Sequence, residues 1–283
     1  MIEARNLFRI ESKLKKGNKS IPVTSIEKDY VISWLLVGIA KSKLYDILCF
    51  KGGTALKKFY FRDYRFSEDL DFTLMTTTTE DAISEMLQSL YVSVANDSNI
   101  HLSPKDKETH ANSVTFYINF SGPLGADPTK GEVKIDITMN ERMIHEPIER
   151  LLMREYEEYQ DIPDDVMLKV YTLEEIFVEK CVSVLDRSRN EPRDIHDLWY
   201  LTSNKCCEYD TLGRCVSEKG IYHHLTDFAL LNMLDAKESN YQTLWQNRLD
   251  HHVVDLPPFE GVYRQLKRNL KALNDDLLRY RAS

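Results

Sequence analysis

The stretch CFKGGTALKKFYFRDYRFSEDLDFTL, residues 49–74, holds a glycine pair, a basic segment and two aspartates separated by one leucine. The letters DILCF, residues 46–50, predict a short strand that runs into Gly52 and Gly53, and TALKKFYF predicts a helix directly after them. DLDFTL alternates polar and apolar residues, which is the period of a half-buried strand. The stretch therefore predicts a strand, a glycine turn, a helix and a second strand in succession.

The two aspartates of the second strand point to a metal. Alternate side chains of a strand share a face, so Asp69 and Asp71 project together while Leu70 and Phe72 point into the core. Two neighbouring carboxylates repel each other unless a cation neutralises them. A hard divalent cation, Mg²⁺ or alternatively Mn²⁺, is the natural partner of such oxygen ligands. We therefore expect Asp69 and Asp71 to bind a metal.

The glycine turn supplies the complementary half of a site. Gly52 and Gly53 let backbone N–H groups approach a ligand closely, and the following helix N-terminus favours an anion such as a phosphate. Thr54 could cap this helix or donate to a phosphate oxygen. A glycine pair alone is more often structural, and a D-x-D pair alone is commonly just solvated, but their joint order is far more specific. Together they predict phosphoryl or nucleotidyl transfer from a bound triphosphate.

A third carboxylate lies on a later strand. The letters GEVKIDIT, residues 131–138, place apolar side chains on one face and Lys134 and Asp136 on the other. If this strand pairs beside DLDF, Asp136 joins Asp69 and Asp71 in a three-carboxylate site that could hold two metals and activate an attacking hydroxyl. Without that pairing, an isolated strand aspartate is most often merely exposed.

Helices and further strands surround this core. Thr24 and Glu27 form a capping box, and the apolar spacing after it predicts a helix over residues 25–43. Further along, the patterns predict a helix over 80–95, a strand over 113–120 and a turn-rich connection over 121–131. Up to about residue 150 the chain therefore reads as α/β with a small mixed sheet.

The remainder of the chain reads as mainly helical. Thr172 with Glu175 forms a second capping box, and Pro192 favours the start of another helix. We therefore expect an α/β (α+β) domain over residues 1–150 and a mainly helical domain over residues 151–283.

Composition narrows the class of protein. The 283 residues carry a formal net charge of −8, which argues against a protein that coats nucleic acid through an overall positive field but leaves a local basic groove open. The five cysteines are scattered without a C-x-x-C pair, so neither a disulfide framework nor a zinc site is indicated. The longest apolar run, VISWLLVGIA from Val31, is far shorter than the roughly 20 residues of a membrane helix, and the N-terminus lacks a signal-peptide core. We expect a cytoplasmic protein with no membrane partner.

The combination of these motifs resembles the nucleotidyltransferase superfamily typified by DNA polymerase β, whose pattern is a glycine turn, a helix, a D-x-D strand and a later strand aspartate. More narrowly, EKDYVISWLL (27–36), FKGGTALKKFY with RFSEDLDF (50–72) and VEKCVSVLDRSRNEPRDIHDLWYL (178–201) resemble the AbiEii/MenT family of bacterial toxins. The resemblance implies a polymerase β-type core followed by a helical domain. Residues after about 204 match nothing that we can assign.

The family resemblance implies a toxin of a toxin–antitoxin or phage-abortive system. It implies transfer of nucleotides from an NTP to an acceptor, which is tRNA in the MenT-like members, and it implies a cognate antitoxin. Matched by motif, Asp69 and Asp71 would bind Mg²⁺. The nucleotide-contacting positions implied by the same motif are Gly52, Gly53, Thr54 and Lys57.

The later block carries further implied site residues. Lys180 and Asp194 match family active-site positions, with Arg193 beside them on the nucleotide-binding side. Lys180 also falls in the middle of the apolar stripe of its helix, where a lysine either snorkels to solvent or lines a cleft and meets a triphosphate. The family match favours the cleft. Arg193 and Asp197, four residues apart, could instead form a surface ion pair.

These observations predict an Mg²⁺-dependent nucleotidyltransferase in which Asp136 activates the acceptor hydroxyl and the helical domain contributes Lys180 and Asp194 to the cleft. Two alternatives stay open. One is an enzyme with the same core that modifies a protein or a small molecule. The other is a non-catalytic module that binds a nucleotide or a partner.

Overall fold

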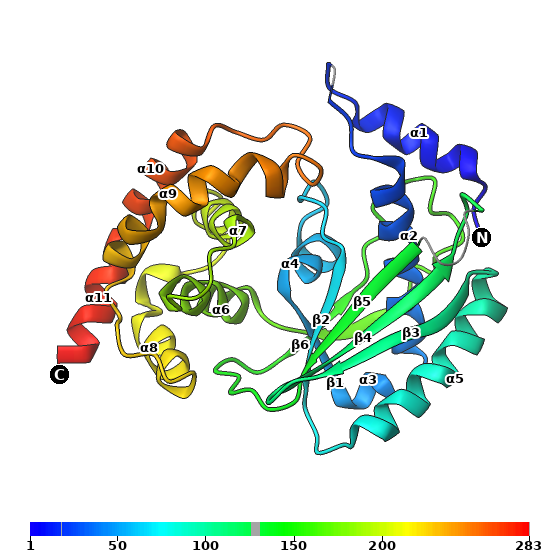
Figure 1. The fold of residues 1–283 in the computed structure, drawn as a ribbon, viewed down its shortest axis with the longest axis horizontal. Coiled ribbons are helices and arrows are strands. Elements are labelled where there is room, and N and C mark those ends of the chain that lie inside the picture. The colour runs from blue at the N-terminus through cyan, green and yellow to red at the C-terminus, as the bar shows by residue number, and fades with distance from the viewer. Residues whose placement is uncertain (18, 126–130, 283) are drawn as a thin grey trace. The chain divides into compact units, whose positions relative to one another are not determined.

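The computed structural model describes residues 1–17, 19–125 and 131–282 (Figure 1). The chain divides into two compact units, which are described separately. The first unit comprises Met1–Glu141, Pro147–Val170 and His251–Val254, and the second comprises Arg142–Glu146, Tyr171–Asp250 and Asp255–Ser283. The segment after residue 150, up to Val170, thus packs with the first unit, although the sequence suggested a change of domain near residue 150.

The first unit is built on a seven-stranded mixed sheet with the order β3-β4-β5-β2-β1-β7-β6. Its strands are β1 (Leu48–Lys51), β2 (Asp69–Leu74), β3 (His101–Thr109), β4 (Ser113–Ser121), β5 (Gly131–Thr138), β6 (Ile148–Leu151) and β7 (Met167–Val170). Its helices are α1 (Ala4–Leu14), α2 (Val23–Ala40), α3 (Leu44–Ile47), α4 (Gly52–Ala55), the π-helix η1 (Leu56–Tyr60) and α5 (Glu80–Ser98). The predicted α/β class is confirmed.

The register of the central strands brings the predicted carboxylates together. Strand β2 pairs antiparallel with β1 and parallel with β5. In the second pairing Asp71 lies opposite Asp136, and Asp69 lies opposite Lys134. The conditional prediction that residues 131–138 pair beside the D-x-D strand is therefore confirmed.

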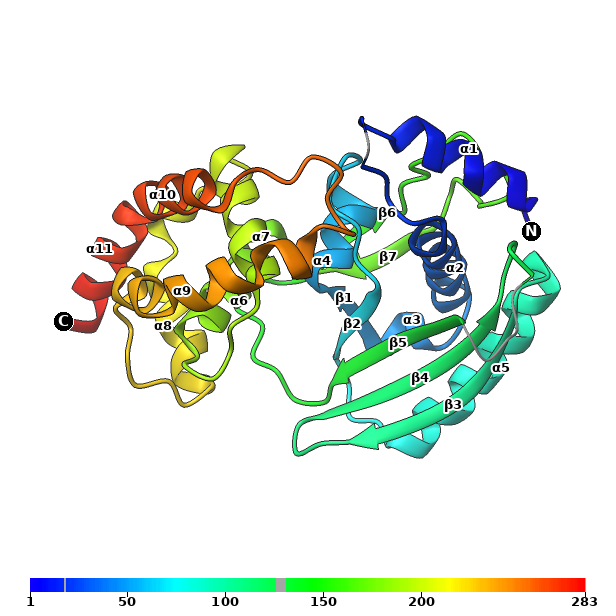
Figure 2. The same cartoon turned by 45° about the horizontal axis from the view of Figure 1, so that its top comes forward.

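One face of the sheet carries the core of the first unit. Nearly the whole circumference of α2 is buried, because it packs against α5 as well as β5 and β7. Helix α5 runs alongside β3 and β4 (Figure 2). The apolar side chains of β2 and β5, such as Phe72 and Ile135, are fully buried on this side. Alternation along the strands therefore directs Asp69, Asp71 and Asp136 toward the opposite face.

The first capping box was predicted wrongly. Helix α2 begins at Val23, and its N-cap is Pro22 without any side-chain hydrogen bond. Glu27 is buried and accepts the backbone N–H of Leu124 at 2.7 Å, so its carboxylate satisfies a loop donor. The pattern of Thr24 followed by Glu27 fits a capping box by spacing, but a tertiary contact takes the carboxylate.

Other differences have local causes. The helix after the glycines is confirmed, but it widens into η1 after four residues. Strand β3 was missed because almost every residue of HLSPKDKET is exposed, which leaves no apolar alternation to detect. Strands β6 and β7 are only four residues each. Part of the predicted turn over 121–131 lies outside the described residues.

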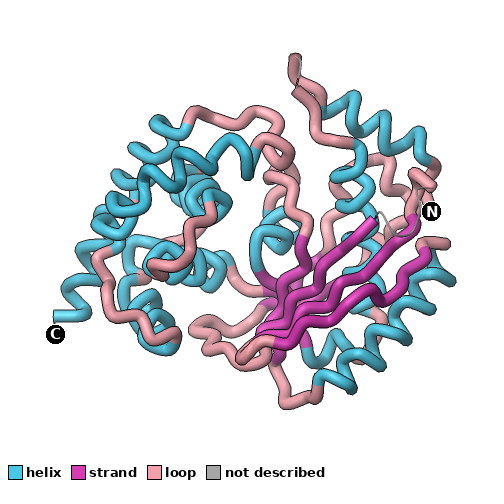
Figure 3. The backbone as a smooth tube through the Cα atoms, viewed as in Figure 1, coloured by secondary structure: helices cyan, strands magenta, loops and turns pink. Residues whose placement is uncertain are grey.

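The second unit is helical over its described residues, and the described strands all belong to the first unit (Figure 3). Its helices are α6 (Leu173–Leu185), α7 (Pro192–Ser203), the 3₁₀-helix η2 (Tyr209–Thr211), α8 (Gly213–Tyr222), α9 (Leu230–Leu249), α10 (Phe259–Asn269) and α11 (Lys271–Ala282). Helix α6 packs against α7, α8 and α9. Among the described helices, none combines the length and the apolar character that crossing a membrane requires.

Both predicted helix starts of the second unit are confirmed. The hydroxyl of Thr172 accepts the backbone N–H of Glu175 at 3.2 Å, which caps α6. Pro192 is the first residue of α7, where its missing N–H costs nothing. These starts position Lys180 on α6 and Asp194 in the first turn of α7.

Candidate active site

The glycine turn lies against the first carboxylate strand. Gly52 has φ +78°, a left-handed conformation that glycine adopts without strain. A Cβ atom at Gly52 would lie 2.5 Å from Oδ2 of Asp71, and at Gly53 it would collide with the guanidinium of Arg65. Gly52 therefore requires glycine for its backbone conformation, whereas a side chain at Gly53 would have to displace the Arg65 guanidinium. The turn, one metal-binding candidate and an arginine are in direct contact.

Two residues of the predicted nucleotide motif face the interior instead. Thr54 is fully buried, and its hydroxyl donates to the backbone carbonyl of Asp69, which ties α4 to β2. The ammonium of Lys57 is also buried and lies 4.2 Å from the centre of the Phe66 ring. Neither side chain is exposed at the turn.

Lys57 belongs to a buried ion cluster, which we define as Asp29, Lys57, Lys58 and Glu155. Lys58 Nζ lies 2.8 Å from Asp29 Oδ2 and 2.9 Å from Glu155 Oε2, while Lys57 Nζ lies 3.1 Å from Glu155 Oε1. All four side chains are at most 1% exposed. Burial alone would raise the pKa of Asp29, but the two ammonium groups outweigh it and hold that pKa below its usual value. The cluster joins α2, η1 and the segment after β6.

Asp69, Asp71 and Asp136 form what we call the carboxylate face. Asp136 Oδ1 accepts the hydroxyl of Thr115 at 3.2 Å, and Oδ2 lies 3.2 Å from Nζ of Lys134. The side chain of Asp136 is 31% exposed, and those of its two companions are also partly exposed. In contrast to the buried ion cluster, this face can be reached from solvent.

The carboxylate face matches a divalent cation by donor type, because carboxylate oxygens are the ligands that Mg²⁺ prefers. The Asp71 carboxylate lies directly against the backbone of the glycine turn, because a Cβ at Gly52 would be 2.5 Å from its Oδ2. Within residues 1–17, 19–125 and 131–282, no three acidic, histidine or cysteine side chains converge closely enough to hold one ion. In this arrangement the oxygens of Asp136 are engaged by Thr115 and Lys134.

The second unit brings Lys180 and Asp194 together. Lys180 Nζ lies 2.6 Å from Asp194 Oδ1 and 2.9 Å from Asp197 Oδ2. Arg189 Nε binds the other oxygen of Asp194 at 2.7 Å. Burial raises the pKa of Asp194, but the charges of Lys180 and Arg189 outweigh this effect and lower it below its usual value. The residues form a compact charged group on α6, α7 and the loop between them.

Arg193 and Asp197 differ in their exposure and in their contacts. Arg193 Nε lies 3.1 Å from Glu191 Oε1, whereas Asp197 is fully buried and pairs with Lys180. The loop before α7 is held by Lys237, whose buried ammonium donates to the backbone carbonyls of Val184, Asp186 and Arg189. This anchoring fixes the loop that carries Arg189.

Lys134, Arg65 and Arg189 lie beside predicted site residues but were not assigned a role from sequence. Lys134 shares the polar face of its strand with Asp136, so period-two alternation was the signal that could have found it. Arg65 and Arg189 lie outside helices and strands, where no periodic pattern predicts a contact. Only the path of the chain places them beside Gly53 and Asp194.

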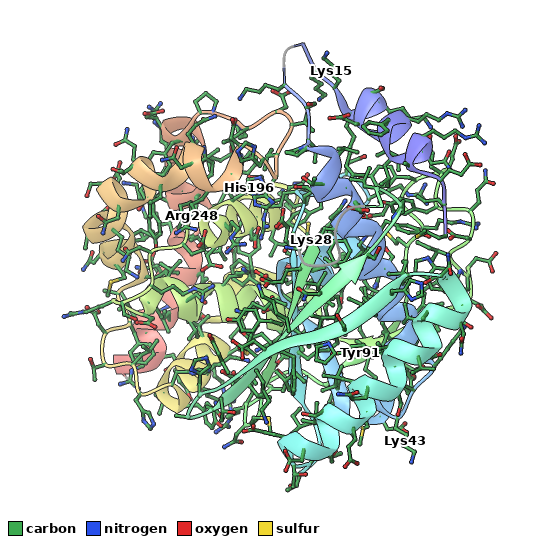
Figure 4. The ribbon with its side chains drawn as sticks, turned by 45° about the vertical axis from the view of Figure 1, so that its right-hand side comes forward. Lys15, Lys28, Lys43, Tyr91, His196 and Arg248 are labelled. Carbon is green, nitrogen blue, oxygen red and sulfur yellow. The ribbon has the colours of Figure 1, made fainter. Side chains whose placement is uncertain are left out.

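A pocket of about 320 Å³ opens at the beginnings of β2 and β5. Three glutamates line it, Glu27, Glu68 and Glu132, together with Lys28, which lies on α2 (Figure 4). Lys28 Nζ is already paired with Glu68 at 3.1 Å. An acidic lining of this kind disfavours a triphosphate, so the phosphate-binding candidate stays with the glycine turn.

Comparison with known proteins identifies a family and a fold for this chain. The family described as nucleotidyl transferase AbiEii toxin, type IV toxin–antitoxin system, matches residues 34–267. No curated protein matches the sequence significantly. Among solved structures, MenT4, a nucleotidyltransferase toxin from Mycobacterium tuberculosis, has a TM-score of 0.66 and 12% identity, covering 99% of this chain and 93% of that one. JHP933 from Helicobacter pylori has a TM-score of 0.56 and 16% identity, covering 93% and 97%.

At these identities the two solved structures establish the fold alone, whereas the family match spans both units and includes the D-x-D strand and the block with Lys180 and Asp194. The resemblance inferred from the motifs is confirmed. The chain belongs to the AbiEii family of nucleotidyltransferase toxins of type IV toxin–antitoxin systems.

Proposed function

We propose that this toxin transfers a nucleoside monophosphate from an NTP to a hydroxyl group of tRNA, with Mg²⁺ as the cofactor. The observation that carries the proposal is the contact between the glycine turn and the carboxylate face. Asp71 lies against Gly52, and Asp136 lies opposite Asp71 on the neighbouring strand. A phosphate group and acidic side chains can thus be held side by side on adjacent elements.

Each residue of this group has a proposed part. Asp69 and Asp71 would hold Mg²⁺, which supplies neutralisation of the negative charge on the phosphates when bound. The backbone of Gly52 and Gly53 and the guanidinium of Arg65 would bind phosphate oxygens, because Arg65 is next to the turn. This division assigns the metal to β2 and the phosphate contacts to the turn and Arg65.

In the proposed reaction the oxygen of the acceptor hydroxyl forms a bond to the α-phosphorus of the NTP. The bond from that phosphorus to the bridging oxygen breaks, and pyrophosphate leaves with the electron pair. Asp136 would accept the hydroxyl proton, because its carboxylate is partly exposed on the same face. An Asp136→Ala variant that keeps the parent transfer rate would remove Asp136 from this role.

The remaining predicted site residues have two kinds of proposed role, contact with the nucleotide and support of the turn. Lys180 and Asp194 rest on the family match, with Lys180 proposed to contact the triphosphate and Arg193 to assist it. Thr54 and Lys57 would reach a nucleotide only if the turn rearranged, because both are buried. Their proposed contribution is to hold the turn and β2 in place.

The acceptor and the partners follow from the family resemblance. We propose tRNA, as in the MenT-like members, and a cytoplasmic site of action where NTP and tRNA are both present. The type IV toxin–antitoxin family implies a cognate antitoxin, which we propose as the partner that neutralises the protein during phage defence or growth control. The net charge of −8 requires that tRNA be bound by a local basic surface rather than by the overall field.

The proposal is tested by incubating the protein and its Asp69→Asn variant with Mg²⁺, each α-labelled NTP in turn, total bacterial RNA and lysate protein. Products are then resolved by size. We expect label on tRNA with the parent alone and not with Asp69→Asn. A matched control is Asp81→Asn, because Asp81 is 94% exposed on α5 and should leave transfer intact.

Three other outcomes would revise the proposal. Label in a protein band would establish a protein acceptor, and label in the small-molecule fraction would establish a metabolite acceptor. NTP binding without any transfer would overturn the enzymatic proposal in favour of a binding module.

A further inference from the structure

The strand that carries Asp136 also delivers a cation to the carboxylate face. Lys134 and Asp136 are two residues apart on β5, so both side chains project from the same side of the sheet. The register places Lys134 opposite Asp69 on β2, the strand next to β5 (Figure 1). The Lys134 ammonium is 3.2 Å from Asp136 Oδ2. It therefore contacts a carboxylate of its own strand and belongs to a residue that lies opposite Asp69 on the neighbouring strand.

The electrostatics of Lys134 agree with this position. The ammonium pairs with Asp136, and the register places Lys134 opposite Asp69, which shares a face of its strand with Asp71. A cation at this position is attracted by all three carboxylates. Lys134 remains charged at neutral pH and offsets part of the repulsion among the three carboxylates.

The contact with Lys134 also occupies Asp136, the carboxylate that would complete a three-carboxylate metal site. Asp136 presents one oxygen to the Thr115 hydroxyl and the other to Lys134. Among the residues that the structure describes, no three acidic side chains converge on one point. The arrangement is that of a face whose negative charge is partly offset by a side chain of the protein.

We propose that the Lys134 ammonium is the resident counter-ion of the carboxylate face and competes with a divalent cation for Asp136 and Asp69. The competition sets how much free cation is needed to load the face. This inference rests on the proposed function, because it assigns Lys134 a part in controlling the same site. Since Lys134 is 34% exposed, its long side chain can leave the carboxylates without disturbing the core.

The direct test is metal binding to the nucleotide-free protein, with Mn²⁺ as the probe and the free-ion signal in electron paramagnetic resonance as the readout. Lys134→Met removes the competing charge and keeps the stem, so we expect Mn²⁺ to bind about tenfold more tightly than to the parent. Lys134→Arg restores a cation and should return the affinity to within about twofold of the parent. Lys134→Gln serves as a second neutral variant, and circular dichroism verifies folding.

Lys105→Met is the matched control. Lys105 lies on β3, carries the same charge and pairs with Glu132 at 2.5 Å, but its partner is not a member of the carboxylate face. We expect its loss to change Mn²⁺ affinity less than twofold. An equal gain from Lys105→Met and Lys134→Met would overturn the proposal, because it would reduce the effect to overall charge.

Two further results decide the matter. Unchanged or weaker Mn²⁺ binding to both neutral variants overturns the inference, as does an absence of binding to all of the proteins. Tighter binding to both neutral variants, reversed by Lys134→Arg, supports it. Nucleotide transfer by the parent at saturating Mg²⁺ is measured separately. A failure of transfer together with the Mn²⁺ shift would therefore refute the proposed function and leave the counter-ion role standing.

Discussion

The buried ion cluster and the carboxylate face are both groups of charges next to the helical segment that follows the glycine turn, yet they have opposite characters. In the cluster, two acids and two lysines are at most 1% exposed and contact one another at 2.8–3.9 Å. On the face, Asp136 and Lys134 keep about a third of their side-chain surface in solvent. The comparison teaches that access, rather than the number of charges, separates a candidate site from a structural group.

The physical reason is the cost of changing partners. Charges that are fully removed from water depend on each other, because any uncompensated one would be buried without solvation. Partly exposed charges can exchange a protein partner for water, a metal or a phosphate. The cluster should therefore contribute to stability, whereas the face should contribute to chemistry.

The largest expected effect comes from Asp71→Asn on the carboxylate face. The amide keeps the shape against Gly52 but removes one charge, so we expect nucleotide transfer to fall by about 10³-fold. The free energy of unfolding should change by only about 0.5 kcal/mol, because a partly exposed like-charge contact is relieved. Initial rates with labelled NTP and urea unfolding measure the two quantities. Transfer within tenfold of the parent would mean that the reaction occurs elsewhere.

Glu155→Ala tests the buried ion cluster. It leaves Lys57 and Lys58 buried with Asp29 alone, which should lower the free energy of unfolding by about 3–5 kcal/mol. The measurement is the midpoint and slope of urea unfolding. Glu157→Ala is the control, because Glu157 is 93% exposed and pairs only at 3.6 Å with Lys13. Equal stabilities for the two variants would show that the cluster is not structural.

Gly52→Ala tests the contact between the turn and the carboxylate face. Its left-handed φ should cost about 1–2 kcal/mol of stability in any setting, and its Cβ would also displace the Asp71 carboxylate. In addition, we expect the transfer rate of the folded variant to fall at least about tenfold, because the carboxylate is displaced. Gly17→Ala shares the positive φ of +60° but has no atom within 4 Å of its Cβ position. If both variants retain parent transfer rates, the close approach is irrelevant to catalysis.

Asp194→Asn extends the comparison to the second unit. It removes the charge that Lys180 and Arg189 both bind, which should cost about 2 kcal/mol of unfolding free energy. Asp235→Asn is the control, since Asp235 is 60% exposed and pairs with Lys267 at 2.9 Å. The exposed pair should contribute much less.

The same variant carries a pH signature. Because the folded pKa of Asp194 lies below its unfolded value of about 3.9, its stabilisation is complete above that value and is lost as pH falls through the folded pKa. Between pH 7 and 5 the stability difference between parent and Asp194→Asn should stay constant, and below about pH 4 it should shrink. Urea midpoints across this range provide the measurement. A difference that grows toward acid pH would contradict the assignment.

Much of the fold and of the candidate site could be predicted where a local pattern carries the information. Spacing alone predicts the glycine turn, the D-x-D strand and the strand with Asp136. The site depended on the two strands pairing side by side, and the structure shows that they do. The capping box at Thr24 failed because Leu124, a residue distant in sequence, takes the carboxylate of Glu27. Strand β3 was missed because its exposed residues follow no apolar period.

The sequence by itself determined the order of strand, turn, helix and strand, the shared face of Asp69 and Asp71, and the family. Local conformational preferences and side-chain alternation act over a few residues, so they are legible without the fold. Only the tertiary structure decided that Lys57 is enclosed in an ion cluster and that Lys134, which alternation already placed on the face of Asp136, forms an ion pair with it. Burial and charge partners depend on elements far apart in the chain, and no local pattern encodes which of two lysines will meet water.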